Sequence, residues 1–295
     1  MLTNLQINSF KNYLALERRA SESTISSYLR DVSRFNDYLI KREISDLKNV
    51  VEEDVSLFLS QLLDDGYAPS SVSRIAVAIK VFFTYMADSG ALNVNPLAEF
   101  QPPKHKKELP AILTVKEVEL LINQPKTYTP KGLRDKAMLE TMYATGVCVS
   151  ELVALDAGDI NLNTKLLTCR SGKERTIPLS SAAVKALNAY FPSVRDNMCA
   201  HPDERALFVN INGKRMSRQG LWKILKYYKE KAKIDKEITP HTLRHCFAAH
   251  MLANGADPKF LQGILGHADI ASTLIYSKVV NKSLKDGYLK SHPRA

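Results

Sequence analysis

Apolar residues recur at helical spacing over the first hundred residues and predict a bundle of four or five helices. The first helix covers residues 3–19, and a second follows a cap candidate at Ser21. A third begins near Glu53, and a fourth runs over about residues 70–86. Each has apolar side chains three and four positions apart, which gives it one face to bury.

Prolines interrupt the chain after this bundle, in the stretch FQPPKHKKELP. Because proline resists both helix and sheet, we predict a linker at residues 101–112, between domains at 1–100 and 113–295. Three basic side chains lie in the linker: Lys104, Lys106 and Lys107. They could lie against a phosphate backbone or could keep a tether in solution, and the sequence favours neither.

The second domain predicts helices around a small β-hairpin. Thr114 and Glu117 form a capping box before an apolar helix, and another helix follows at about residues 133–143. The strand-like stretches LLTCR and ERTIPL flank a turn at residues 171–173, which is typical of a hairpin. The fold class is therefore mostly α with two domains, a helical bundle followed by an α+β domain.

The rest of this domain predicts further helices and one more strand. Ser180 caps a helix, ALFVN predicts a strand, and a helix covers about residues 217–233. Pro240 fixes the start of a helix that Gly255 ends, and a short helix at 258–265 ends at Gly266. The chain closes with a short basic tail.

Composition narrows the range of partners. The net charge is +10 with a pI near 9.3, which favours a polyanion, although many basic proteins bind none. The apolar runs are shorter than the roughly 20 residues that cross a bilayer, and the N-terminus lacks a signal-peptide layout. The four cysteines show no disulfide or metal-ligand spacing, so we expect a cytoplasmic protein with no membrane partner.

Four residues between positions 241 and 276 fit one chemistry. His241 and Arg244 share a face at a helix N-terminus, which suits an anion, while His267 and Tyr276 follow two short elements later. Each residue alone is more often structural. Together they supply a nucleophile, a forked cation for phosphate oxygens and hydrogen-bonding imidazoles. A phosphotyrosyl ester keeps the bond energy, so we expect no metal and no cofactor.

The stretches HTLRH and LGHADIASTLIY resemble the C-terminal signature of the tyrosine recombinase (phage integrase) family, and most closely its bacterial Xer branch. The resemblance covers nearly the whole chain. It implies a SAM-like core-binding domain, a catalytic domain, and site-specific DNA strand exchange through a 3′-phosphotyrosyl bond and a Holliday junction. It also implies a homo-tetramer or a hetero-tetramer with a paralogue on two duplexes, with a C-terminal tail that docks on a neighbour through Leu284 and Leu289.

The resemblance also assigns roles. Tyr276 is the nucleophile, Arg244 binds the non-bridging oxygens, and His241 and His267 hydrogen-bond the phosphate, with His241 a candidate acceptor of the tyrosine proton. The family motif T-G-x-R-x-S-E-L has Cys148 where the first catalytic arginine stands. Losing one positioned donor costs roughly 3–4 kcal/mol, or 10²–10³ in rate. Cys148 could be an engineered knockdown or natural drift, or another cation such as Arg170 could replace the arginine.

The hairpin turn departs from the family pattern G-K-G-x-K-E-R as well. Counting back from E-R places Arg170 at the lysine that protonates the leaving 5′-oxygen, whereas a shortened turn places Lys173 there. We prefer Lys173, because arginine scarcely releases a proton near neutral pH. A solvated turn lysine is the alternative.

Other basic side chains of the second domain are candidate DNA contacts, although each could equally be solvated surface: Arg170, Arg175, Lys214, Arg215 and Arg218. Two other functions stay open beside recombination, namely a DNA-binding accessory protein that no longer cleaves and a relaxing enzyme like type IB topoisomerases. A helical transcription regulator ranks lower. The sequence does not separate chromosome-dimer resolution from mobile-element integration, although its compact length favours the Xer-like role.

Overall fold

A computed structural model describes residues 4–103, 110–267 and 269–277 of the chain. The chain forms two compact units, Met1–Lys107 and Glu108–Ala295, and the boundary falls inside the segment expected to be a linker. Lys104, Lys106 and Lys107 lie outside the described residues, as does the C-terminal tail with Leu284 and Leu289.

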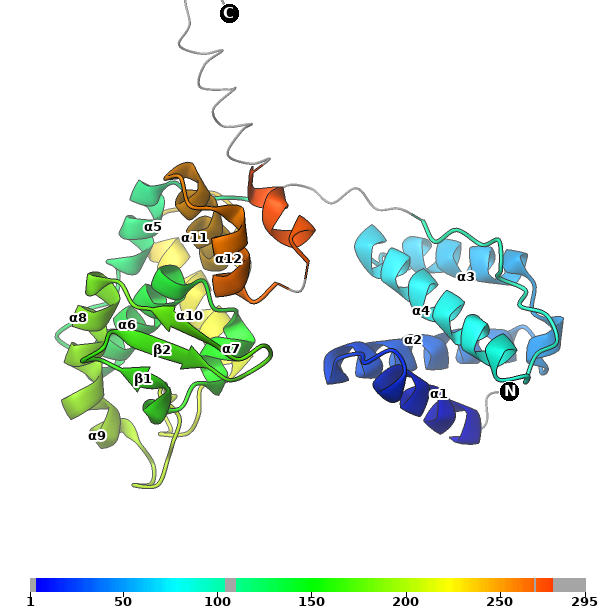
Figure 1. Cartoon of the computed structure of the whole chain (residues 1–295), viewed down its shortest axis with the longest axis horizontal. Helices are drawn as coiled ribbons and strands as arrows, with labels where there is room; N and C mark the ends of the chain where they lie inside the picture. The colour runs from blue at the N-terminus through cyan, green and yellow to red at the C-terminus, as the bar shows by residue number, and fades with distance from the viewer. Residues whose placement is uncertain (1–3, 104–109, 268, 278–295) are drawn as a thin grey trace, which may run out of the picture. The chain divides into compact units, whose positions relative to one another are not determined.

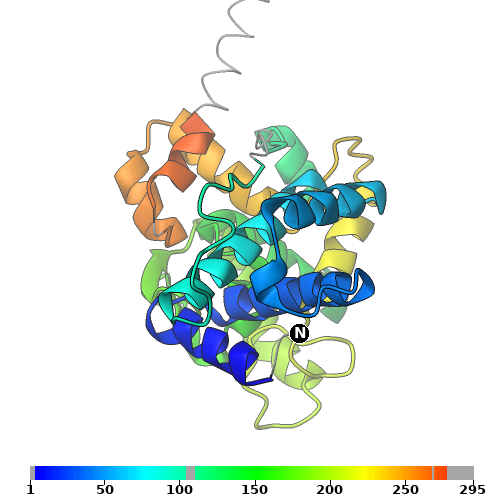
Figure 2. The ribbon, with the colours of Figure 1, turned by 90° about the vertical axis from the view of Figure 1, so that its right-hand side faces the viewer.

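The first unit is a helical bundle, as predicted. Its elements are α1 (Asn4–Leu16), α2 (Glu22–Lys41), the 3-10 turn η1 (Leu47–Asn49), α3 (Glu52–Asp64) and α4 (Pro69–Asp88). The Ser21 hydroxyl caps α2 by accepting the Thr24 N–H. In Figures 1 and 2, α2 and α4 run side by side, and their apolar faces share one core with α1 and α3.

Helix α4 corrects one expectation from the sequence. By length and composition alone this 20-residue helix is apolar enough to cross a membrane. It packs as a core helix instead, because eight of its side chains are buried inside the unit, among them Ile75, Phe82 and Phe83. The apolar character of this helix is therefore explained by its place in the core of the bundle.

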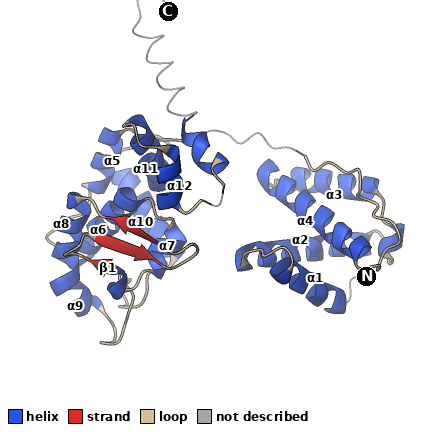
Figure 3. Cartoon of the chain, in the orientation of Figure 1, coloured by secondary structure: helices blue, strands red, loops and turns tan. Residues whose placement is uncertain are grey.

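The second unit surrounds a small sheet with helices (Figure 3). Its elements are α5 (Val115–Ile122), α6 (Pro130–Thr145), α7 (Val149–Ala154), η2 (Ala157–Asp159), β1 (Ile160–Asn161), β2 (Leu166–Cys169), β3 (Arg175–Pro178), α8 (Ser181–Tyr190), η3 (Phe191–Arg195), α9 (Asp196–Met198), α10 (Arg218–Lys231), α11 (Thr242–Ala253) and α12 (Pro258–Leu265). Residues 271–277 are also helical.

Both local signals at the start of this unit are confirmed. The Thr114 hydroxyl accepts the Glu117 N–H at 3.2 Å, and the Glu117 carboxylate accepts the Thr114 N–H at 2.6 Å, which completes the capping box. The hairpin pairs β2 with β3 antiparallel, with Cys169 opposite Arg175. Residues 170–174 form its loop, where Gly172 has a φ of 80°.

Several elements differ from the sequence prediction, and the first helix ends at Leu16 where it was expected to reach residue 19. ALFVN is no strand, because it makes only isolated bridges, from Ala206 to Asp156 and from Val209 to Arg215. Its four apolar side chains are at most 1% exposed, so the apolar run reflects the burial of this segment. An apolar run alone does not distinguish a buried strand from a buried loop. Helix α11 begins at Thr242 with His241 as its N-cap, so Pro240 lies just outside the helix.

Candidate active site

Two glycines bring the ends of α6 and α12 close to other elements. Gly146 ends α6 in the left-handed conformation, with φ 63°, and a Cβ there would lie 2.3 Å from the Phe247 ring. Gly266 ends α12 in the same way, and a Cβ there would lie 2.9 Å from the Arg175 guanidinium. Any side chain at these positions would push the elements apart, so glycine permits the site to close.

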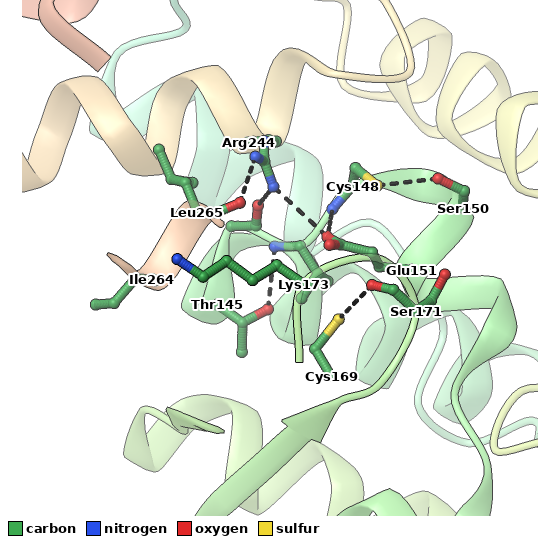
Figure 4. Close-up of polar contacts among 12 residues, drawn as sticks. Thr145, Cys148, Ser150, Glu151, Cys169, Ser171, Lys173, Arg244, Ile264 and Leu265 are labelled. Atoms are coloured by element: carbon green, nitrogen blue, oxygen red, sulfur yellow. Dashed lines mark hydrogen bonds and ion pairs between the residues drawn. The ribbon is translucent and has the colours of Figure 1, made fainter. Parts of the chain in front are cut away.

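Arg244 links these two ends. Its guanidinium donates to the Gly146 carbonyl at 2.7 Å and to the Leu265 carbonyl at 2.7 Å (Figure 4). The Glu151 carboxylate lies 3.6 Å from the same guanidinium. Because two carbonyls and one carboxylate fix the fork, Arg244 is a preorganised cation at the N-terminal end of α11.

Glu151 and Arg175 form a buried ion pair beneath the site. The Arg175 guanidinium donates to both Glu151 oxygens, at 2.7 and 3.0 Å, and to the Ile264 carbonyl at 2.5 Å. Burial alone would raise the pKa of Glu151, but hydrogen bonds from Arg175 and the Cys148 N–H lower it overall. The Arg175 side chain is 8% exposed and bonds inward, so it holds the hairpin against α7 and α12. The DNA contact expected of it stays a prediction.

Cys148 is the N-cap of α7. Its backbone N–H donates to Glu151 at 2.8 Å, and its thiol lies 3.0 Å from the Ser150 hydroxyl. The cap therefore uses the backbone of Cys148 and not its thiol. The bond from the Cys148 N–H to Glu151 does not depend on which side chain stands at this position.

Arg170 and Lys173, the two candidates for the catalytic lysine of the hairpin, have different surroundings in the loop. Arg170 pairs with Asp159 at 2.9 Å, and its side chain is 67% exposed. The Lys173 carbonyl accepts from Arg175 at 3.2 Å, which ties this residue to the Glu151 cluster, and Figure 4 draws its side chain among the site residues. Arg170 is therefore held by η2, whereas Lys173 belongs to the loop beside the site.

Both predicted histidines are neutral near pH 7. Burial, then the charges of Arg244 and Arg218, lowers the pKa of His241. Burial, then the charges of Arg244 and Arg175, lowers the pKa of His267 to about 4. The Thr273 hydroxyl lies 2.8 Å from His267 Nδ1, so the Nε2 of this ring is the nitrogen left to face a phosphate.

Tyr276 is buried and bonded to a residue that sequence reasoning missed. Its phenol oxygen lies 2.8 Å from His245 Nδ1, and the side chain is 3% exposed. Burial raises the pKa of Tyr276, although the charge of Arg244 opposes this shift. Burial, then the neighbouring His241, Arg244 and His267, lowers the pKa of His245 to about 4. His245 stands inside the motif HTLRH, next to Arg244, which was the available signal.

The remaining basic candidates, Lys214, Arg215 and Arg218, are all exposed, and Arg215 is also anchored to the protein. Arg215 donates to the Val153 and Leu155 carbonyls, at 3.0 and 3.1 Å, and pairs with Asp156, so it fastens the loop before α10. Lys214 is exposed in the turn before it. Arg218 is exposed at the start of α10, close enough to His241 to lower its pKa.

Known proteins share both units. The phage integrase family model matches residues 111–282, and the model of the phage integrase N-terminal SAM-like domain matches residues 7–90. Tyrosine recombinase XerD of Halalkalibacterium halodurans is 39% identical over 295 residues, 99% of each chain. Tyrosine recombinase XerC of Herpetosiphon aurantiacus is 42% identical over 279 residues, 94% of this chain and 91% of that protein.

Solved structures agree. The crystal structure of XerA recombinase is 29% identical over 99% of this chain and all of that chain, with a TM-score of 0.55. XerH site-specific recombinase in a post-cleavage complex with its palindromic difH substrate shares the fold, with 19% identity over 97% of this chain and 84% of that chain and a TM-score of 0.76. By both family models and by relatives that match its whole length, the chain belongs to the phage integrase family of tyrosine recombinases.

Proposed function

We propose that this chain is a site-specific DNA recombinase that cuts and rejoins strands through a 3′-phosphotyrosyl intermediate on Tyr276. The observation that carries the proposal is the meeting of α11, the end of α12 and residues 271–277. The His245 ring lies 6.1 Å from the His241 ring, and its Nδ1 lies 2.8 Å from the Tyr276 phenol. On the same helix, Arg244 bonds the Leu265 carbonyl, two residues before His267. A cation, imidazoles and a phenol brought together in this way match the needs of phosphodiester transfer.

The roles follow from the bonds already made. Two N–H groups of Arg244 donate to carbonyls, and we assign its remaining N–H groups to the non-bridging oxygens of the scissile phosphate. We assign His267 Nε2 and His241 to hydrogen bonds with the same phosphate, and His241 is the candidate acceptor of the tyrosine proton. Lys173 protonates the leaving 5′-oxygen. The 5′-hydroxyl of a partner duplex then attacks the phosphotyrosine, which restores the phosphodiester and frees Tyr276.

Cys148 attenuates this activity. Cys148 stands where the family has its first catalytic arginine. The candidate replacement, Arg170, pairs with Asp159 at 2.9 Å through a side chain that is 67% exposed. Loss of one positioned donor lowers cleavage by at least about 10²-fold. The same observation favours a second candidate, an accessory protein that binds recombination sites and leaves cleavage to a partner.

The partner is double-stranded DNA carrying a specific site. We propose a homo-tetramer, or a tetramer shared with a paralogue, on two duplexes. The exposed Lys214 and Arg218 contact the DNA backbone, and the protein acts in the cytoplasm, where chromosomal DNA lies.

A covalent-trapping assay tests the proposal. A nicked duplex bearing a candidate site loses a short fragment after cleavage, so the phosphotyrosyl adduct accumulates and is counted on a denaturing gel. We expect Cys148→Arg to raise the adduct yield at least 10²-fold, because it restores a guanidinium beside Glu151. Cys148→Ala is the matched control and should give no gain.

The tyrosine is tested in the same assay. Tyr276→Phe in the Cys148→Arg background should abolish the adduct. DNA binding without any adduct in the Cys148→Arg protein would reject cleavage and favour the accessory role. An adduct that survives Tyr276→Phe would show that another residue is the nucleophile.

A further inference from the structure

The helical residues 271–277 are fastened by two bonds to histidines outside them. Thr273 and Tyr276 lie three positions apart on one face, and both are buried, with 0% and 3% exposure. The Thr273 hydroxyl meets His267 Nδ1 and the Tyr276 phenol meets His245 Nδ1, each at 2.8 Å. The face that carries the nucleophile is therefore turned inward onto α11 and the loop after α12.

A buried phenol does not attack DNA. The attacking oxygen must come within about 3–3.5 Å of a phosphorus atom that is part of a duplex. The Tyr276 side chain is almost without solvent contact, so a backbone phosphate has no path to its oxygen in this arrangement. Residues 271–277 must move before cleavage, and the bond from Tyr276 to His245 must break.

We propose that His245 is a positioning residue for the nucleophile: its Nδ1 holds the Tyr276 phenol in a stored position, and release of this bond precedes attack on DNA. The identity of Tyr276 as nucleophile rests on the proposed function above. The stored position itself rests on the contact between the two side chains and on their burial.

A proton acceptor role for His245 fits the site less well. The pKa of His245 is lowered to about 4 and that of Tyr276 is raised, so transfer of the proton from the phenol to the imidazole is disfavoured. The groups that face His245 oppose its charging: the His241 ring is 6.1 Å away, and Arg244 and His267 also lower its pKa. The phenol therefore keeps its proton, and the hydrogen bond joins a neutral phenol to a neutral imidazole.

The full chain without DNA supplies the first test. N-acetylimidazole acetylates accessible tyrosine phenols, and peptide mass spectrometry follows Tyr276 against two internal references, the exposed Tyr128 and the buried Tyr190. His245→Leu removes the acceptor, and we expect the acetylation rate of Tyr276 to rise roughly 3- to 10-fold, the equilibrium factor of one net hydrogen bond. His245→Asn keeps an acceptor near the place of Nδ1 and should stay close to the parent rate.

The chain offers a matched control in the same helix. His250 Nδ1 lies 2.8 Å from the Tyr143 phenol, so His250→Leu breaks an equivalent bond elsewhere. It should raise the acetylation of Tyr143 and leave Tyr276 unchanged. If His245→Leu is unfolded by circular dichroism, His245→Ala replaces it. An unchanged rate at Tyr276 in a folded His245 variant overturns the stored position.

Adduct formation in the Cys148→Arg background supplies the second test. With the phenol released, His245→Leu should form the phosphotyrosyl adduct at the parent rate or up to about 10-fold faster. A fall of 10² or more with Tyr276 fully reactive towards N-acetylimidazole would overturn the proposal and place His245 in the chemistry. If the Cys148→Arg parent forms no adduct while acetylation responds to His245→Leu, the stored position holds and the proposed function fails.

Discussion

The Glu151 carboxylate binds the Arg175 guanidinium through two hydrogen bonds, of 2.7 and 3.0 Å, directly below Cys148. Their side chains are 11% and 8% exposed. The pair joins the start of α7 to β3, and Arg175 continues to the end of α12 through the Ile264 carbonyl. This ion pair therefore holds α7, β3 and the end of α12 together beneath the site.

Glu151→Gln should lower the free energy of unfolding by about 3–5 kcal/mol, because it leaves the buried charge of Arg175 without a partner. Urea denaturation followed through Trp222, which is the one tryptophan of the chain and lies in the same unit, measures this change. Lys236→Gln removes one member of the Lys236–Glu117 pair, whose side chains are 43% and 30% exposed, and should cost less than about 1 kcal/mol. An equal loss of unfolding free energy in the two variants would show that the Glu151–Arg175 pair stabilises the fold no more than an ordinary ion pair does.

Stability should fall as the pH drops from 6.5 towards 5, before most carboxylates titrate. His245 and His267 have pKa values of about 4 when folded against an ordinary 6.5, so the unfolded chain binds protons first and unfolding becomes easier. The contribution is complete above about pH 6.5. The lowered pKa of Glu151 acts the same way, but only at pH values below its ordinary 4.5.

Urea midpoints between pH 7.5 and 5, read from Trp222 fluorescence, check this dependence. His245→Asn replaces a titrating group with a neutral one and should flatten the curve. His201, which lies exposed outside the site, serves as the control in His201→Asn, with an unchanged slope expected. A slope that His245→Asn leaves intact would assign the pH dependence to other groups.

Lys173→Ala in the Cys148→Arg background should lower cleavage by about 10²–10⁴-fold, the range for a lost general acid. A substrate with sulfur at the 5′-bridging position needs no protonation of its leaving group, so cleavage of that substrate should return to the parent rate. Arg170→Ala is the control for the hairpin register and should change neither reaction by more than a few-fold, since Asp159 holds that side chain. Sulfur rescue of Arg170→Ala in place of Lys173→Ala would reverse the assignment.

Gly146→Ala should destabilise the second unit by about 2–5 kcal/mol. The position has φ 63°, which costs a non-glycine residue about 1–2 kcal/mol, and the new Cβ would overlap the Phe247 ring. Gly158→Ala makes the same change where no atom lies within 4 Å, so it should be nearly neutral by the same urea denaturation. A small loss at Gly146 would mean that α11 can move away from the end of α6 at little cost.

Much of the site could be predicted from the sequence, because short motifs and helix signals mark its residues. Caps and helical periodicity placed α5, α8 and α12 close to their observed bounds. The resemblance of HTLRH and LGHADIASTLIY then selected His241, Arg244, His267 and Tyr276, and the same comparison exposed the missing arginine at Cys148.

Other features had no local signal. Arg170 and Lys173 are three residues apart in one loop, and only the presence of Asp159 across the hairpin separates their surroundings. Arg175 looked like a surface cation until Glu151, 24 positions earlier in the chain, was found to bind it. ALFVN was apolar enough for a strand, yet no partner strand runs beside it among the described residues.

The sequence by itself determined which elements form, where most helices begin and end, and which residue types bear the chemistry. These depend on contacts between residues a few positions apart, which spacing records directly. Only the tertiary structure decided that Tyr276 is buried against His245, that Arg175 is bonded inward and that Arg170 is held by Asp159. Those outcomes depend on which chain segments meet in space, and that depends on the packing of the whole domain.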